Sequence, residues 1–351
     1  MTVSELGERR LLARIRARLN RTTRPSPAMV LGIGDDAAIV APQRNAQTVL
    51  TTDAHIEGVH FERRFSAPAD IGCRALAVNL SDLAAMGATP RWALLSLALP
   101  DALAVDEVEG IADGVAILAA THGVTVIGGN LTRSPGPLMI DITAVGEVRP
   151  RRALTRSGGR PGDELWISGT IGGAAAGLEM LRKFDRLELP ATDDRQPIDD
   201  RVAATADRRE CIARYLRPDP RVRLGLAIGQ NKAARAAMDL SDGLADAVDQ
   251  LATASGCGAE IDAATLPITP GARAWWETAG VDAITAALSG GDDYELLFAV
   301  PRTWGGRVRH ARSRVADPPL TRIGVMTKDP GARVLLRNGA RERLPGGFEH
   351  F

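Results

Sequence analysis

Short apolar segments alternate with longer amphipathic segments along the first half of the chain. Runs rich in Val, Ile and Leu predict strands, and apolar residues spaced three and four positions apart predict helices. The predicted strands are Val49–Thr52, Trp92–Leu99, Val124–Ile127 and Leu138–Val148. The predicted helices lie near Asp70–Met86 and Asp106–His122. Leu12, Ile15 and Leu19 recur at helical spacing, which predicts a short docking helix near the start.

The second half repeats the alternation, so the pattern predicts two α/β domains. Its predicted strands lie near Glu164–Ser168, Ala236–Leu240, Ala259–Asp262, Tyr294–Val300 and Thr321–Val325. Its predicted helices lie near Gly173–Lys183, Leu244–Ser255 and Ala272–Ala279. Arg149–Asp163 is rich in Arg, Gly and Pro and lacks apolar periodicity, so we place the domain boundary there, between residues 1–149 and 150–351. Asp185–Glu210 has few large apolar residues and predicts a solvated or mobile connection without chemistry.

Composition narrows the class of protein. A chain of 351 residues with 45% hydrophobic content can bury two ordinary cores. The formal net charge is zero and the 43 basic residues are scattered, so no nucleic-acid partner is expected. Three cysteines far apart in the sequence argue against a disulfide framework and favour a reducing cytosol. No window approaches the ~20 apolar residues of a membrane span, so we expect a cytoplasmic protein that does not bind membranes.

Acidic residues stand beside small residues at the ends of five predicted elements. The five motifs are Gly34-Asp35-Asp36, Thr51-Thr52-Asp53, Asn79-Leu80-Ser81-Asp82, Asp239-Leu240-Ser241-Asp242-Gly243 and Gly290-Gly291-Asp292-Asp293. One such motif alone more often caps a helix or closes a turn. Five together predict a shared cation, because clustered carboxylates repel one another. Mg²⁺ prefers oxygen ligands and shares phosphate oxygens with its substrates, so the motifs indicate a polyphosphate site.

Other nucleotide-binding signatures are missing from the sequence. There is no G-x-x-x-x-G-K-[ST] motif and no protein-kinase signature. The segment Gly169–Gly173 follows a predicted strand and opens a helix, where it can bind an anion, but a tight turn for packing is the simpler interpretation. His55 and His60 are five positions apart, which is not the spacing of a helical zinc site. His60 is either a phosphate contact or an ordinary histidine.

In this order, the motifs resemble those of thiamine-monophosphate kinases, in the superfamily of aminoimidazole-ribonucleotide synthase. The resemblance runs from about Gly7 to Phe351. Its most specific stretches are Leu31–Asp36, Thr51–Asp53, Gly58–Phe61, Ala75–Ala88, Ala153–Ser157, Asp239–Gly243 and Leu288–Leu296.

The resemblance implies ATP-dependent conversion of thiamine monophosphate to thiamine diphosphate by a homodimer. It implies an N-terminal domain that binds ATP and Mg²⁺ and builds a β-barrel shared with a second subunit, a C-terminal α/β domain, and an active site in the cleft between them. The implied Mg²⁺ ligands are Asp36, Thr51, Thr52, Asp53, Asp82, Asn130, Asp239 and Asp242. The implied ATP contacts are Gly129, Asn130, Arg156 and Ser241, and the implied thiamine-phosphate contacts are His60, Asp292 and Phe348.

Two positions depart from the pattern of the family. Asn130 stands where many members carry a metal-binding Asp, and its neutral amide oxygen binds Mg²⁺ less tightly than a carboxylate, which leaves the number of metal ions open. Asp292 stands where Glu is common.

The chemistry predicts direct in-line transfer without a catalytic side chain. A phosphate monoester has its second pKa near ~6, so thiamine monophosphate already offers an anionic oxygen at neutral pH. Phe348 can hold the thiazolium ring by cation–π attraction or serve as a hydrophobic anchor for the chain end. Two alternatives remain: another ATP-using enzyme of the superfamily, or an inactive nucleotide-binding protein, which Asn130 alone supports. A selenophosphate synthetase is disfavoured because no cysteine precedes Cys73.

Overall fold

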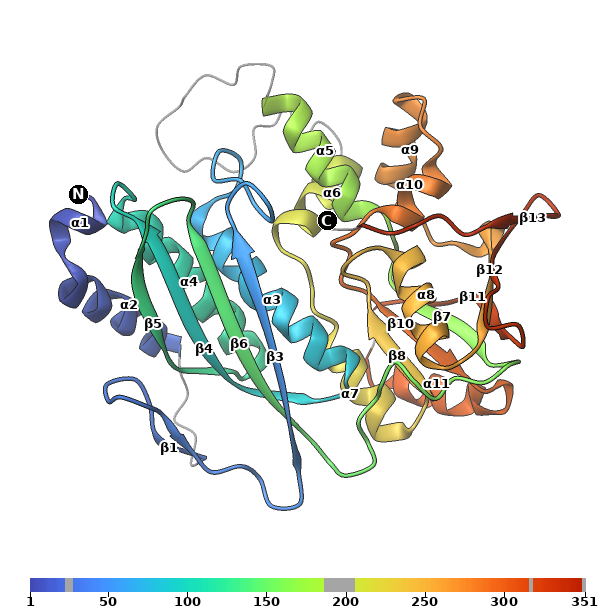
Figure 1. The fold of residues 1–351 in the computed structure, drawn as a ribbon, viewed down its shortest axis with the longest axis horizontal. Coiled ribbons are helices and arrows are strands. Elements are labelled where there is room, and N and C mark those ends of the chain that lie inside the picture. Colours follow the sequence, from blue (N-terminus) through green and yellow to red (C-terminus); the bar gives the residue numbers. More distant parts are fainter. Residues whose placement is uncertain (23–27, 186–205, 316–317, 349–351) are drawn as a thin grey trace. The chain divides into compact units, whose positions relative to one another are not determined.

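A computed structural model describes residues 1–22, 28–185, 206–315 and 318–348. The chain divides into two compact units, each with helices and sheets, which confirms the predicted mixed α/β class (Figure 1). Unit 1 comprises Met1–Leu83 and Ala88–Arg151, and unit 2 comprises Ala84–Gly87 and Arg152–Phe351. Among the described helices, none combines the length and hydropathy that crossing a bilayer requires.

Unit 1 is built on a four-stranded sheet with the strand order β3-β6-β4-β5. Its strands are β3 (Gln47–Ile56), β4 (Thr89–Pro100), β5 (Thr125–Ser134) and β6 (Met139–Val148), and a separate pair comprises β1 (Met29–Leu31) and β2 (Ile39–Val40). All four predicted strands are present. β6 pairs antiparallel with β3 and β4, whereas β5 pairs parallel with β4. The described part of unit 1 is an open sheet rather than a closed barrel, so the shared barrel stays a prediction.

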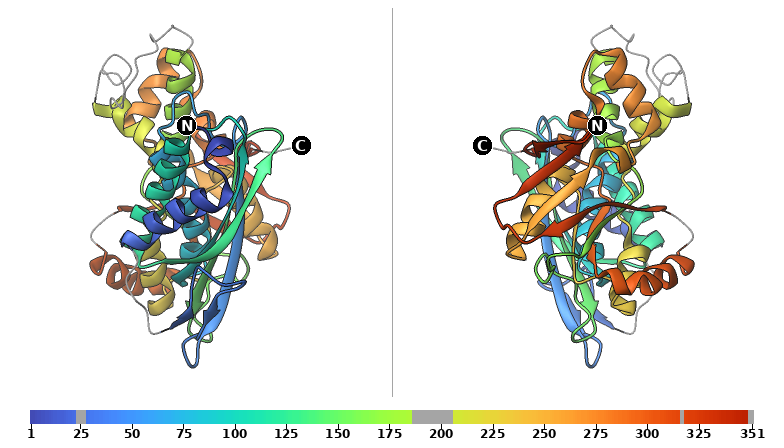
Figure 2. Two further views of the ribbon diagram at one scale, coloured as in Figure 1. Left: turned by 90° about the vertical axis from the view of Figure 1, so that its left-hand side faces the viewer. Right: turned by 90° about the vertical axis from the view of Figure 1, so that its right-hand side faces the viewer.

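The helices of unit 1 gather on one side of this sheet, where α2 packs against α4 (Figure 2). They are α1 (Val3–Leu6), α2 (Glu8–Thr22), α3 (Pro68–Ala85) and α4 (Val105–His122). A Cβ atom at Gly72 would lie 2.0 Å from the Ile111 carbonyl oxygen, and one at Gly114 would lie 2.0 Å from that of Ala69. Only glycine permits this approach, which brings the backbones of α3 and α4 into contact.

The first long helix confirms the predicted docking helix but turns a different face inward. Ile15 and Leu19 are buried as expected, yet Leu12 is 47% exposed. Leu11, at 2% exposure, takes the inner position instead, so the apolar stripe runs through residues four apart. Arg18 of α2 donates to Glu109 of α4, which fixes the two helices against each other.

Unit 2 contains a seven-stranded sheet with the order β13-β12-β9-β11-β7-β10-β8. Its strands are β7 (Glu164–Ser168), β8 (Ala236–Asp239), β9 (Gly258–Asp262), β10 (Leu296–Val300), β11 (Leu320–Thr327), β12 (Arg333–Arg337) and β13 (Ala340–Arg343). Figure 2 shows β12 and β13, in red, at one edge. Its helices are α5 (Gly173–Asp185), α6 (Ala206–Leu216), α7 (Val222–Asn231), α8 (Leu244–Ala254), α9 (Pro270–Thr278), α10 (Ala283–Ser289) and α11 (Gly305–Ser313), with short 3₁₀ turns at Ala263–Thr265 and Arg302–Trp304.

All five predicted strands and all three predicted helices of the second half are present, but several further elements escaped prediction. These are α6, α7, α10, α11, β12 and β13. The expected connection Asp185–Glu210 is wrong at its end, because Ala206 already begins α6. Cys211, Ile212, Tyr215 and Leu216 form the buried stripe of that helix, which its arginines obscure in the sequence. Residues 186–205 lie outside the described residues.

Candidate active site

In unit 1, the Thr51-Thr52-Asp53 motif lies in the middle of β3, where successive side chains point to opposite faces of the sheet. The Thr51 hydroxyl donates to Asp82 Oδ2 of α3 at 2.5 Å. On the other face, the Thr52 hydroxyl donates to Asp141 Oδ1 of β6 at 3.0 Å. The structure thus joins two of the predicted residues, Thr51 and Asp82. It also adds Asp141, which no sequence motif singled out.

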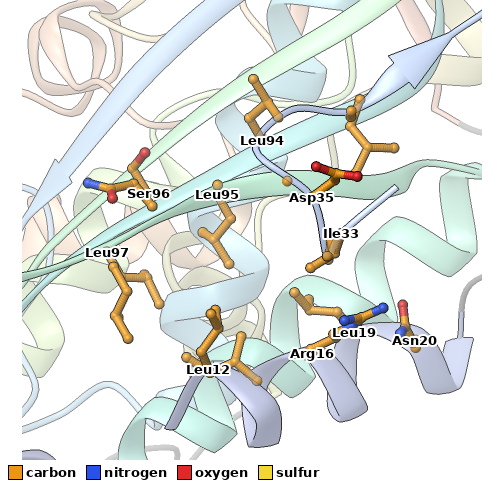
Figure 3. A pocket seen from close by; sticks show the side chains of 18 of the residues that line it. Leu12, Arg16, Leu19, Asn20, Ile33, Asp35, Leu94, Leu95, Ser96 and Leu97 are labelled. Carbon is orange, nitrogen blue, oxygen red and sulfur yellow. The ribbon is translucent and has the colours of Figure 1, made fainter. Parts of the chain in front are cut away.

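A pocket of 1280 Å³ in unit 1 contains a second group of predicted residues. Asp36, Gly129 and Asn130 line it together with residues of α2, β4 and β5. Figure 3 shows Leu12 of α2 facing Leu95 and Leu97, and Arg16, Leu19 and Asn20 of the same helix lying below Ile33 and Asp35. A Cβ atom at Gly129 would lie 1.8 Å from the Leu95 carbonyl oxygen, so glycine is required there. Apolar residues such as Leu95 and Leu97 and polar residues such as Asp36 and Asn130 line the same pocket.

His60 belongs to a stack of rings at the end of β3. Its ring centroid lies 5.2 Å from that of His55, and its Nδ1 accepts the Ile56 N–H at 3.1 Å. A neutral imidazole that accepts at Nδ1 carries its proton on Nε2, the form that suits donation to a phosphate oxygen. His55 is 3% exposed, and burial, followed by the charge of Arg74, holds its pKa well below the usual value. His55 therefore packs as a neutral ring beneath His60.

In unit 2, the end of β8 gathers four predicted residues: Ser241, Asp242, Asp292 and Phe348. The Ser241 hydroxyl lies 3.3 Å from Asp242 Oδ2. The Asp292 N–H donates to the Ser241 carbonyl at 2.7 Å, and the Phe348 N–H donates to the Asp242 carbonyl at 3.1 Å. Asp239, the last residue of β8, is 4% exposed.

The position of Phe348 bears on its two interpretations. A hydrophobic anchor buries its ring, but the residue is 53% exposed. The backbone holds this end of the chain instead, through the hydrogen bond to Asp242 and through Gly347, which packs against Asp246. The substrate contact of Phe348 stays a prediction.

Arg156, a predicted ATP contact, is held by a chain of side chains on α8. Its Nη1 donates to Gln250 Oε1 at 2.6 Å, and Gln250 Nε2 donates to Asp246 Oδ2 at 2.6 Å. Burial raises the pKa of Asp246, and the charge of Asp242 adds to the effect. The four-residue spacing of Asp246 and Gln250 places both on one face of α8, which is the signal in the sequence for this contact.

The Gly169–Gly173 segment forms the predicted tight turn, and the anion at the start of α5 is a side chain of the protein itself. Asp293 accepts the Gly172 N–H at 2.6 Å and the Ala174 N–H at 3.2 Å. Burial raises the pKa of Asp293 from 3.8 to about 6, against the opposing charge of Arg214. The Asp293 side chain therefore occupies the N-terminus of α5, and the adjacent Asp292 accepts the Tyr294 hydroxyl instead.

Across the described residues, no three His, Cys, Asp or Glu side chains lie close enough to hold a metal ion. The predicted ligands are oxygen donors, which fits Mg²⁺ and argues against softer metals. Mg²⁺ usually keeps several waters and takes substrate phosphate oxygens, so pairs such as Thr51 and Asp82 suit an ion that arrives with a nucleotide.

Comparison with known proteins identifies the class to which this fold and these motifs belong. A family model described as AIR synthase related protein, N-terminal domain, matches residues 34–148, and its C-terminal counterpart matches residues 160–337. Thiamine-monophosphate kinase of Escherichia coli (strain K12) is 40% identical over 324 residues, which cover 92% of each chain. The chain belongs to the thiamine-monophosphate kinase family.

Two solved structures are similar over most of their length. The crystal structure of thiamine-monophosphate kinase from Stenotrophomonas maltophilia K279a has a TM-score of 0.76 and 41% identity, covering 92% of this chain and 94% of that chain. AaThiL complexed with AMPPCP and TMP has a TM-score of 0.71 and 34% identity, covering 100% of this chain and 99% of that chain.

The raised pKa of Asp293 predicts a specific pH dependence of stability. The folded chain binds this proton more tightly than the unfolded chain, so the carboxyl's contribution is largest below pH 4 and is lost as pH rises through about 6. The shift from 3.8 to about 6 corresponds to a loss on the order of 3 kcal/mol. Urea unfolding from pH 4 to pH 7 should show Asp293→Asn gaining stability relative to the wild type as pH rises. A stability difference that does not change with pH contradicts the assignment.

Proposed function

We propose that this chain transfers the γ-phosphoryl group of ATP to thiamine monophosphate, giving thiamine diphosphate and ADP. The observation that carries the proposal is the gathering of Ser241, Asp242, Asp292 and Phe348 at one end of the unit 2 sheet. The relatives support it, since they are named for this activity and AaThiL was crystallised with both AMPPCP and TMP. AMPPCP stands in for ATP.

Asp292 and Phe348 are suited to the thiamine end of the acceptor. The thiazolium ring is cationic, so a carboxylate attracts it and an exposed aromatic face adds ~0.5–2 kcal/mol of cation–π attraction. The Tyr294 hydroxyl donates to Asp292 Oδ1 at 3.1 Å, which orients that carboxylate. His60 offers a donor for the acceptor phosphate, and Arg156 and Ser241 serve the nucleotide.

We propose Mg²⁺ as the cation of the site. Its candidate ligands in unit 1 are Asp36, Thr51, Thr52, Asp53, Asp82 and Asn130, and those in unit 2 are Asp239 and Asp242. When bound, the ion neutralises phosphate charge and aligns donor with acceptor. The chain contributes fixed oxygen donors, guanidinium groups and an apolar pocket wall that excludes water from the nucleotide. Because the acceptor is already anionic, no side chain needs to remove a proton from it.

The activity assay measures thiamine diphosphate and ADP formed from ATP and Mg²⁺, with and without thiamine monophosphate. The proposal predicts ADP release that depends strictly on thiamine monophosphate, with inversion at a chiral γ-phosphorus because a single displacement inverts. ADP release with another acceptor supports a different enzyme of the superfamily, and nucleotide binding without ADP release supports an inactive binding protein. Retention at phosphorus contradicts direct transfer.

We also propose that a second copy of the chain covers the open face of the unit 1 sheet. Leu50 is 67% exposed and Leu94 is 38% exposed on this face, beside the Thr52–Thr143 pair. Exposed large apolar residues on one sheet face mark an interaction surface. Light scattering should give the mass of a dimer, and a monomer at micromolar concentration contradicts the arrangement.

Replacing either Asp53 or Asp242 with Asn should lower kcat by about 100-fold and raise the Mg²⁺ concentration needed for half-maximal rate, because a charged oxygen donor is lost. The measurement is a Mg²⁺ titration of the rate at saturating ATP. Asp101→Asn serves as the control, since Asp101 is an exposed partner of Arg133 outside the predicted site. Unchanged kinetics in both variants would remove these residues from the metal site.

Replacing Phe348 with Ala should raise the KM for thiamine monophosphate about tenfold, in line with a loss of ~1 kcal/mol or more of cation–π attraction, and leave the KM for ATP unchanged. Phe348→Tyr, which keeps the aromatic face, should retain affinity. Equal affinity of the Ala and wild-type proteins for thiamine monophosphate would assign Phe348 to packing alone.

A further inference from the structure

The segment that carries Asp292 is tied to unit 2 by two carboxylates, and the family motifs assign neither of them a role. We propose that Glu295, clamped by Arg214 and Arg221, is a positioning residue that fixes the Asp292–Tyr294 backbone and so sets the place of the Asp292 carboxylate. The inference rests on the proposed substrate role of Asp292.

Two sets of contacts hold this segment. The N–H groups of Asp292 and Tyr294 donate to the carbonyls of Ser241 at 2.7 Å and Leu240 at 2.9 Å. The Asp293 carboxylate accepts two N–H groups at the start of α5. The proposed substrate residue Asp292 is therefore followed directly by a residue whose side chain is anchored elsewhere in unit 2.

Glu295 is the most firmly held of these side chains. It is 0% exposed, and Arg221 grips it at both oxygens, with Nε 2.7 Å from Oε2 and Nη2 2.5 Å from Oε1. Arg214 Nη2 donates to Oε1 at 2.9 Å, and the Ser168 hydroxyl donates to Oε2 at 2.5 Å. Bidentate guanidinium–carboxylate pairs restrict orientation as well as distance.

The surrounding loop leaves no room for Glu295 to move. A Cβ atom at Gly169 would lie 2.0 Å from Glu295 Oε1, so the glycine turn closes directly over the carboxylate. Arg214 also donates to the Thr170 hydroxyl at 2.8 Å and to its carbonyl at 2.7 Å, which joins α6 to the same turn. Glycines of the Gly169–Gly173 turn thus leave the space that the Glu295 carboxylate and the Arg214 side chain occupy.

The backbone that this clamp holds is strained. Asp292 and Tyr294 have φ values of 70° and 48°, in the left-handed region that residues with a Cβ atom rarely adopt. Such residues persist where surrounding contacts over-determine them, and they gather at functional sites. Stability alone does not account for the clamp, because well-packed apolar residues often stabilise a core as well as a buried ion pair does. Fixing the strained segment does account for it.

The clamp also connects to the strand that follows. The Ser168 hydroxyl accepts the Leu296 N–H at 2.9 Å while it donates to Glu295, and the Leu240 N–H donates to the Glu295 carbonyl at 2.9 Å. A displaced Glu295 would therefore shift the Leu240 to Ser241 backbone on which Asp292 rests. A substitution of Glu295 should therefore displace Asp292, the proposed contact to thiamine monophosphate, and leave the nucleotide contacts in place.

The test uses the full chain and the steady-state kinetics of Glu295→Gln. The variant keeps the side-chain volume but presents an NH₂ group to the guanidinium groups, so KM for thiamine monophosphate should rise about tenfold while KM for ATP stays within about twofold. Asp282→Asn is the matched control: Asp282 holds Arg337 through two bonds of 2.8 and 2.7 Å and caps α10 in the same unit. Its kinetics should match the wild type.

A double-mutant cycle separates positioning from a general loss of structure. In an Asp292→Ala background, Glu295→Gln should add little further loss, because the contact it positions is already gone. Full additivity of the two losses, or equal rises in both KM values, overturns the inference. If Glu295→Gln fails to fold, Arg221→Lys keeps the charge, loses the bidentate grip and is measured in the same cycle. A wild-type chain that makes no thiamine diphosphate overturns the proposed function, and the inference falls with it.

Discussion

Repulsion between negative charges is the constraint on which the rest of this structure depends. Several carboxylates stand in the motifs of the candidate site, and each one needs a hydrogen-bond donor or a cation. Some bind groups of the protein itself: Asp293 binds the start of α5, and Glu295 binds two arginines. We propose that others, Asp82 among them, share a cation that arrives with phosphate.

Unit 2 shows this division within four consecutive residues. The side chains of Asp293 and Glu295 hold the chain through contacts to α5 and to two arginines, whereas we propose that Asp292 contacts the cationic acceptor. The segment has an energetic cost, because its backbone is left-handed at Asp292 and Tyr294. The buried contacts of Asp293 and Glu295 hold this backbone in place, which joins the packing of the unit to its proposed chemistry.

The sequence predicted helices and strands better than it predicted the contacts that individual side chains make. Every predicted strand is present, because Val, Ile and Leu runs report burial directly. Helix α6 was missed because its arginines, among them Arg214, which binds Glu295, interrupt its apolar stripe. The motif Gly290–Asp293 could not reveal which aspartate turns inward, since that depends on α5, more than a hundred residues away in the sequence. Asp141 escaped for the same reason, because only strand pairing brings it to Thr52.

The central claim is that nucleotide affinity depends on a cation screening phosphate from carboxylate, and calorimetric titration of the chain with AMPPCP tests it most directly. With Mg²⁺ present, the account predicts tight binding that weakens by about 100-fold or more in excess chelator, since several unscreened like charges each cost about 1 kcal/mol at close range. Equal affinity in both conditions would contradict the account.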